Sequence, residues 1–144
     1  MKIALSSRWH SFRWVAQEHE KASMNPSLFY RTAASVSTFG VVAHEFVGAP
    51  MVLAPLDNTG LSDNVIWLHH FSWHTGSVAV IAMVGMYLYA SARPGNCPMA
   101  IVATLIALGF AALAVSLSLI SNSIGWTTPA PYIWTMVTVM GGIG

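Results

Sequence analysis

The sequence has 144 residues, of which 55% are hydrophobic and only 8% are charged, against roughly 25% charged residues in an average soluble domain. A soluble fold of this size needs polar groups over its whole surface, so the composition excludes an ordinary soluble domain and favours the lipid bilayer as the main partner. The few basic residues are sparse and mixed with acidic ones, which argues against nucleic-acid binding. The single cysteine excludes an intrachain disulfide and multi-cysteine metal motifs.

Residues 1–27 form the most polar part of the chain and are predicted to be a separate cytoplasmic segment. They contain no apolar run long enough for the core of an export signal. Apolar residues recur there at helical spacing, at Leu5, Trp9, Phe12 and Ala16. This spacing predicts an amphipathic helix lying on the inner surface of the membrane. The alternatives are a disordered tail or a translation start at Met24.

Residues 28–144 are predicted to form an all-α transmembrane bundle, with four helices as the expected number. The first helix is expected over residues 29–49, because Pro50 disfavours helical backbone at the residue before it. Residues 51–56 are then expected to leave the helix as an extended or kinked stretch. Good N-capping residues at 62–64 begin the second helix, which continues to about Ala92.

The third helix is expected to start at Pro98 and to run to about Ser121, and a polar, uncharged connector follows over residues 122–131. The fourth apolar segment spans residues 132–144, which is ~20 Å of helix. A bilayer core of ~30 Å requires about 20 helical residues. The last helix is therefore expected to be short, or truncated by the end of the chain.

Basic residues predict the orientation of these helices. Five of the six lie before the first apolar segment, the first loop has none, and Arg93 lies in the second loop. Basic residues favour the cytoplasmic side of a membrane. The sequence therefore predicts a multi-pass protein of a bacterial inner membrane with its N-terminus in the cytoplasm.

Polar and aromatic side chains cluster at membrane depth in the first two helices: His44 and Glu45 in the first, and His69, His70, Trp73 and His74 in the second. In an antiparallel pair, His44 would lie ~22 Å along the first helix, and His70 and His74 ~10 and ~16 Å down the second. The two sets should therefore meet at a similar depth. His70 and His74 are four residues apart and share one face of the helix.

Three interpretations of this cluster remain open. In the first, Glu45 or His44 forms a hydrogen bond to His70 or His74 and fixes the register of two helices. In the second, His44, His70 and His74 bind a cofactor, either haem b or a metal ion, since imidazole is a suitable ligand for iron, copper and zinc. In the third, Glu45 and the histidines relay protons or bind a small solute.

No haem attachment motif is present, and the His-x-x-x-His spacing lacks the glutamate of the zinc protease motif. The sequence therefore predicts no catalytic residue, no defined metal site and no cofactor. It favours a non-enzymatic accessory or scaffolding protein, as a homo-oligomer or within a larger membrane complex. The alternatives are a haem- or metal-binding redox protein and a proton-coupled or small-solute transport component.

One further pattern is carried by His44, Gly48, Pro55, Leu56, Trp73 and His74. It resembles a group of small, uncharacterised bacterial four-helix membrane proteins. In that group a histidine near the end of the first helix precedes a glycine and a Pro-Leu pair, and a Trp-His-x-Thr-like sequence follows in the second helix. Here Thr75 directly follows the histidine, which departs from that spacing. The resemblance covers about residues 28–144 and implies topology only.

Overall fold

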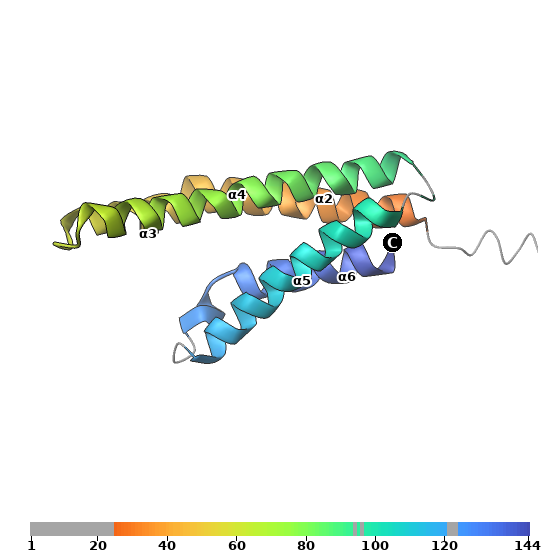
Figure 1. Cartoon of the computed structure of the whole chain (residues 1–144). Helices are drawn as coiled ribbons and strands as arrows, with labels where there is room; N and C mark the ends of the chain where they lie inside the picture. Colours follow the sequence, from red (N-terminus) through yellow and green to blue (C-terminus); the bar gives the residue numbers. More distant parts are fainter. Residues whose placement is uncertain (1–24, 94, 96, 121–123) are drawn as a thin grey trace, which may run out of the picture.

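The computed structural model describes residues 25–93, 95, 97–120 and 124–144. The amphipathic helix predicted near the N-terminus lies outside this part of the chain. Within it the fold is all-α and contains no strand. Its elements are α2 (Pro26–Ala43), a π-helix (His44–Gly48), α3 (Ala49–Val52), a 3-10 helix (Ala54–Asn58), α4 (Asp63–Ala92), α5 (Cys97–Ile120), a second 3-10 helix (Ile124–Thr127) and α6 (Ala130–Ile143) (Figure 1).

Local sequence explains where the first helices begin and turn. The Asn25 side chain accepts a hydrogen bond of 3.1 Å from the backbone N–H of Ser27, which caps α2, and Pro26 occupies its first turn. Gly60 has a φ of +71° in the turn between the two long helical arms. A residue without a Cβ adopts this left-handed conformation at little cost, so the chain can reverse there.

Residues 51–56 were expected to leave the helix as an extended or kinked stretch; they are not extended, because the helical path continues through Pro50, with α3 ending at Val52 and a 3-10 helix starting at Ala54. The N–H of Ala49 bonds to the carbonyl of His44, five residues back, and the N–H of Leu53 bonds to the carbonyl of Ala49 at 2.8 Å. Pro50 thus falls in the first turn of α3, where its missing N–H is tolerated. The π-helix accommodates Pro50 in the helical path. The first long helical arm of the chain therefore extends from Pro26 to Asn58.

Three helices are long and apolar enough to cross a membrane: Pro26–Asn58 with 33 residues, Asp63–Ala92 with 30 and Pro98–Ile120 with 23. The last helix, α6, has 14 residues, or ~21 Å. It is apolar but shorter than a span of the bilayer core. The prediction of an all-α transmembrane bundle with four helices and a short last one is confirmed.

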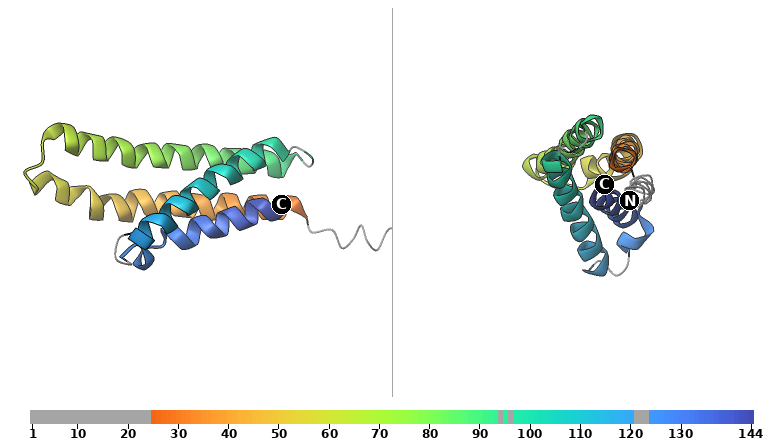
Figure 2. Two further views of the ribbon diagram at one scale, coloured as in Figure 1. Left: turned by 60° about the horizontal axis from the view of Figure 1, so that its bottom comes forward. Right: turned by 90° about the vertical axis from the view of Figure 1, so that its right-hand side faces the viewer.

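The long arms α2 and α4 form an antiparallel hairpin, which α5 crosses obliquely, while α6 packs against both α2 and α5 (Figure 2). The four helices share one core near the first half of α2 and the second half of α4. In that core Tyr30 stacks on Tyr87 with ring centroids 6.3 Å apart. The core residues are Tyr30, Ala33, Ala34, Val80, Met83, Tyr87, Ala90, Ala100, Ala103, Ala107 and Val137.

The other end of the hairpin extends past the ends of α5 and α6 (Figures 1 and 2). We call this part the distal hairpin and define it as residues 44–58 and 63–74. None of the core residues lies in it, and Leu53 is its only buried hydrophobic residue. The distal hairpin is therefore a two-helix structure attached to a four-helix core.

Candidate functional site

The polar cluster predicted from the sequence lies where the π-helix faces α4, in and beside the distal hairpin. The π-helix contributes His44 and Glu45, and α4 contributes Trp73 and His74. The estimate that the two sets meet at similar depth agrees with this arrangement. The contacts divide into two groups, one built on Glu45 and one on Trp73.

Glu45 joins α2 to α4 through its carboxylate. The Nδ1 atom of His74 lies 3.2 Å from Oε1 and 3.1 Å from Oε2 of this carboxylate. The hydroxyl of Ser77, one turn further along α4 and buried, donates a hydrogen bond to Oε1. Both carboxylate oxygens therefore have partners on the opposite helix. This is the cross-helix contact expected from the structural interpretation of the cluster, with His74 as the partner and not His70.

Trp73 lies against the π-helix. Its ring stacks on the imidazole of His44, with centroids 3.9 Å apart and planes inclined by 9°. On Gly48 a Cβ atom would lie 2.9 Å from Cζ2 and 3.3 Å from Cη2 of the same ring. Gly48 is therefore needed for the close approach of the tryptophan. Among the described residues, His44 Nε2 and Trp73 Nε1 are buried without a hydrogen-bond partner.

The role of Gly48 was missed from the sequence. Gly48 and Pro50 together indicated a break in the helix, whereas Gly48 lies at the end of the π-helix and provides the space for Trp73. A glycine one turn from a histidine, opposite a tryptophan at matching depth, is a signal that could have suggested this contact. The bond from Ser77 to Glu45 was also not predicted from the sequence.

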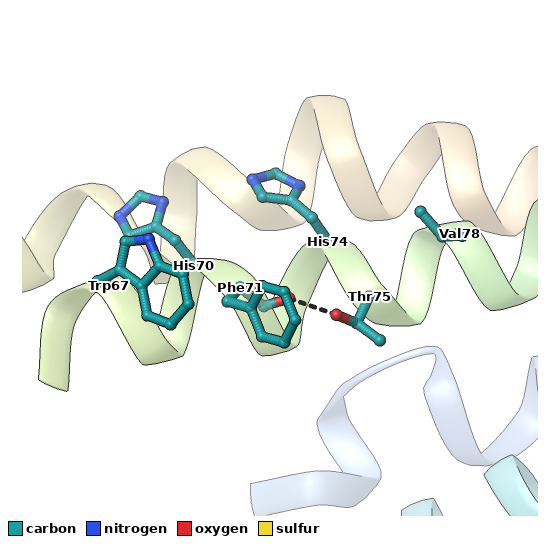
Figure 3. Close-up of a pocket in the computed structure, with 6 residues that line it drawn as sticks. All are labelled: Trp67, His70, Phe71, His74, Thr75 and Val78. Carbon is teal, nitrogen blue, oxygen red and sulfur yellow. Dashed lines mark hydrogen bonds between the residues drawn. The ribbon is translucent and has the colours of Figure 1, made fainter. Parts of the chain in front are cut away.

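The outer face of α4 has an open pocket of about 400 Å³, lined by Trp67, His70, Phe71, His74, Thr75 and Val78 (Figure 3). The rings of His70 and His74 lie with centroids 6.4 Å apart, and those of Trp67 and Phe71 stack at 5.2 Å. All six lining residues belong to α4. The pocket is thus a surface of one helix, and no other helix of the described residues lines it.

The remaining predicted site residue, His69, lies apart from this pocket. Its Nδ1 atom is 2.8 Å from the carbonyl oxygen of Val65, and the side chain is exposed. His44 stacks on Trp73, and the described residues show no ring contact between His44 and His70 or His74. Within the described residues, no group of three or more His, Cys, Asp or Glu side chains is placed to hold a metal ion.

No family model, no curated protein and no solved structure matches this chain. The resemblance to small four-helix bacterial membrane proteins therefore stays a prediction. The function has to be argued from the geometry of the chain itself.

Proposed function

We propose that this chain is a non-enzymatic scaffold of a bacterial inner membrane, and that its distal hairpin binds protein within or beside the bilayer. The polar groups of the cluster support a scaffolding role because they are engaged with each other. Glu45 accepts hydrogen bonds from His74 and Ser77, and Trp73 covers one face of His44. Such contacts fix the register of two helices, and both carboxylate oxygens have partners on the facing helix.

The observation that carries the proposal is the apolar surface of the distal hairpin beyond the core. Several of its large apolar side chains are strongly exposed, among them Phe46 by 78%, Met51 by 73% and Trp67 by 63%. The two arms, of 33 and 30 residues, are ~50 and ~45 Å long, whereas a bilayer core is only ~30 Å thick. Lipid tails can therefore cover only part of this surface.

The expected position of the membrane boundary also places part of the distal hairpin outside the lipid core. About 20 helical residues are needed to cross the bilayer core, so a crossing that begins at Arg93 ends near Trp73. The aromatic residues Trp67 and Phe71 then lie at or beyond the outer boundary. Contiguous exposed apolar surface outside the lipid core is typical of protein–protein contact. A protein partner accounts for this surface better than lipid alone.

Charge supports the orientation that we propose. Four basic residues precede α2 and Arg31 lies in its first turns, while the tip of the hairpin carries Asp57 and Asp63 and no basic residue. Basic residues are retained on the cytoplasmic side. The N-terminus is then cytoplasmic, and the distal hairpin points to the outer face of the membrane.

Site-specific photo-crosslinking in cells tests the proposal. A benzophenone amino acid is placed at Phe46 or Phe71 on the distal hairpin, and at Leu105 on α5 as a matched control, because Leu105 is equally exposed at 60% but lies on the core helices. We expect discrete protein adducts from the two distal positions and none from Leu105. Adducts from Leu105 alone, or from no position, would refute the proposal.

Reconstitution separates the scaffold from the transport alternative. If Glu45 relays protons, the purified chain in proteoliposomes should conduct protons, and Glu45→Gln should abolish this flux. A scaffold predicts that the wild-type chain and the variant give the same background flux. An absorption spectrum with a Soret band would instead favour the haem alternative.

A further inference from the structure

We propose that His70 and His74 bind a divalent transition-metal ion of the Zn²⁺ type, together with the same two residues of a second copy of this chain. The proposal rests on the proposed function, because it identifies the protein partner of the distal hairpin as this second copy. It is carried by the histidine pair, by the carboxylate that orients one of its members, and by the uncovered face on which the pair lies.

The two imidazoles are placed to share one ion. They lie four residues apart on one face of α4 and line the same open pocket (Figure 3). Two histidines at this spacing bind zinc in helical metal sites. With zinc–nitrogen bonds of ~2.0–2.1 Å, two imidazoles on one tetrahedral ion have ring centroids ~5 Å apart. The observed separation of the two ring centroids is 6.4 Å, and small rotations of the side chains would reduce it to the separation that a shared ion requires.

The contact between Glu45 and His74 has the arrangement typical of a metal ligand. Histidines that bind metals usually donate the second ring N–H to a carboxylate, which fixes the tautomer and the orientation of the ring. Here the Nδ1 of His74 is held by Glu45, and Glu45 is in turn held by Ser77. The Nε2 atom of His74 is then the nitrogen with a free lone pair. Glu45 is thus a positioning residue in this proposal.

His70 is available to a ligand in the described chain. Its ring contacts His74, and no hydrogen bond to another residue engages it. His69 differs, since its Nδ1 atom contacts the carbonyl of Val65 and its side chain does not line the pocket. His70 is therefore the position that tests the metal site, and the neighbouring His69 is its control.

A second copy supplies the ligands that one chain lacks. Two imidazoles fill half of a tetrahedral shell, and the described residues contain no group of three His, Cys, Asp or Glu side chains placed to hold the ion. Copies of a membrane protein insert with the same orientation, so a two-fold axis along the bilayer normal keeps each residue at its own depth. An axis that passes beside the histidine pair brings it opposite the histidine pair of the other copy, at the centre of an isologous interface.

The surroundings of the pair suit such an interface. Trp67 and Phe71 stack on each other beside the histidines and are exposed by 63% and 55%. Val78 continues this apolar face toward the core. Aromatic side chains are enriched in the centres of protein interfaces. A symmetric contact would bury them around the metal, and the nearby membrane boundary would allow the ion to arrive from water.

Metal titration of the full chain in detergent or nanodiscs tests this inference. Co²⁺ is added and followed by its visible absorption, Zn²⁺ is used as competitor, and native mass spectrometry gives the ratio of metal to chains. We expect one ion per two chains. His70→Ala should weaken binding at least 100-fold, Glu45→Gln should weaken it about 10–100-fold, and His69→Ala should leave it unchanged.

Several results would overturn the inference. These are a ratio of one ion per chain, a His69→Ala effect as large as that of His70→Ala, or unchanged affinity in Glu45→Gln. His70→Ala removes no hydrogen bond among the described residues, and an unchanged circular dichroism spectrum of this variant separates loss of the metal ligand from a folding defect. Dimers that bind no metal would refute the metal site but not the proposed scaffold function. Failure of the photo-crosslinks at the distal hairpin would refute both proposals.

Discussion

Replacement of Gly48 by alanine should loosen the distal hairpin, because Trp73 occupies the space that the new methyl group needs. The added Cβ would lie 2.9 Å and 3.3 Å from two carbons of the indole ring. An indole ring is rigid, so the whole side chain has to shift away from its stack on His44 at 3.9 Å. Overpacking of this kind costs about 1–3 kcal/mol, and loss of an aromatic stack adds about 0.5–1.5 kcal/mol.

The matched control is Gly76→Ala, on the facing helix, where no atom lies within 4 Å of an added Cβ. Both substitutions remove a helical glycine, which by itself favours the folded state by about 0.5–1 kcal/mol. The difference between the two variants therefore isolates the clash with Trp73. We expect Gly48→Ala to be less stable than Gly76→Ala by about 1.5–4.5 kcal/mol, the sum of the overpacking and stacking costs, measured by SDS titration in mixed micelles with circular dichroism.

A double-mutant cycle identifies the group responsible. In a Trp73→Leu background the space next to Gly48 is open, so Gly48→Ala should change the free energy of unfolding only slightly. The coupling energy between positions 48 and 73 should then be at least about 1 kcal/mol. Equal stability of the Gly48→Ala and Gly76→Ala variants, or additive effects of Gly48→Ala and Trp73→Leu, would refute the assignment of Gly48 as the contact site of Trp73.

Three further variants test other contacts by the same titration. Glu45→Gln should lower the free energy of unfolding by about 0.6 kcal/mol and at most about 1.7 kcal/mol, because the ionised partner of His74 is lost; an unchanged midpoint would contradict this. Gly141→Ala should cost about 1–3 kcal/mol, since its Cβ would collide with the hydroxyl of Tyr87, whereas Gly142→Ala, which points into open space, should cost nothing. Tyr87→Phe removes a 3.1 Å hydrogen bond to a threonine of α5 and should cost about 0.6 kcal/mol; a loss as large as that of Gly141→Ala would argue against this assignment.

The four helices could be predicted because apolar length and turn chemistry determine them locally. The turn around Gly60 and the start of α4 at Asp63 follow from residues next to each other in the sequence. The path of the chain through Pro50 could not be predicted in this way. It depends on the π-helix at residues 44–48 and on Trp73, which packs against it from another helix.

The sequence predicted at which depth along the helices the site residues lie, but not how each helix is rotated about its own axis. Counting residues along antiparallel helices placed Glu45 opposite the histidines of α4, and the structure brings Glu45 to His74. A single residue turns a helix by ~100°, so depth alone could not decide between His70 and His74. The stack of His44 on Trp73, which directs His44 away from that pair, depends on the same unknown rotation.

The polar contacts lie where the four-helix core ends, and membrane physics gives a reason. Lipid tails are as apolar as leucine, so helices in a bilayer associate through close packing and polar contacts and not through the hydrophobic effect. Near the core, α2 packs against α6 and α4 packs against α5, whereas within the described chain none of the core residues lies in the distal hairpin. Contacts from Glu45 and Trp73 across to the facing helix then hold the hairpin together at its exit from the core. Hydrogen exchange should therefore rise in residues 44–58 on Glu45→Gln or Gly48→Ala, while the core around Tyr87 stays protected, because only the distal arms depend on these contacts.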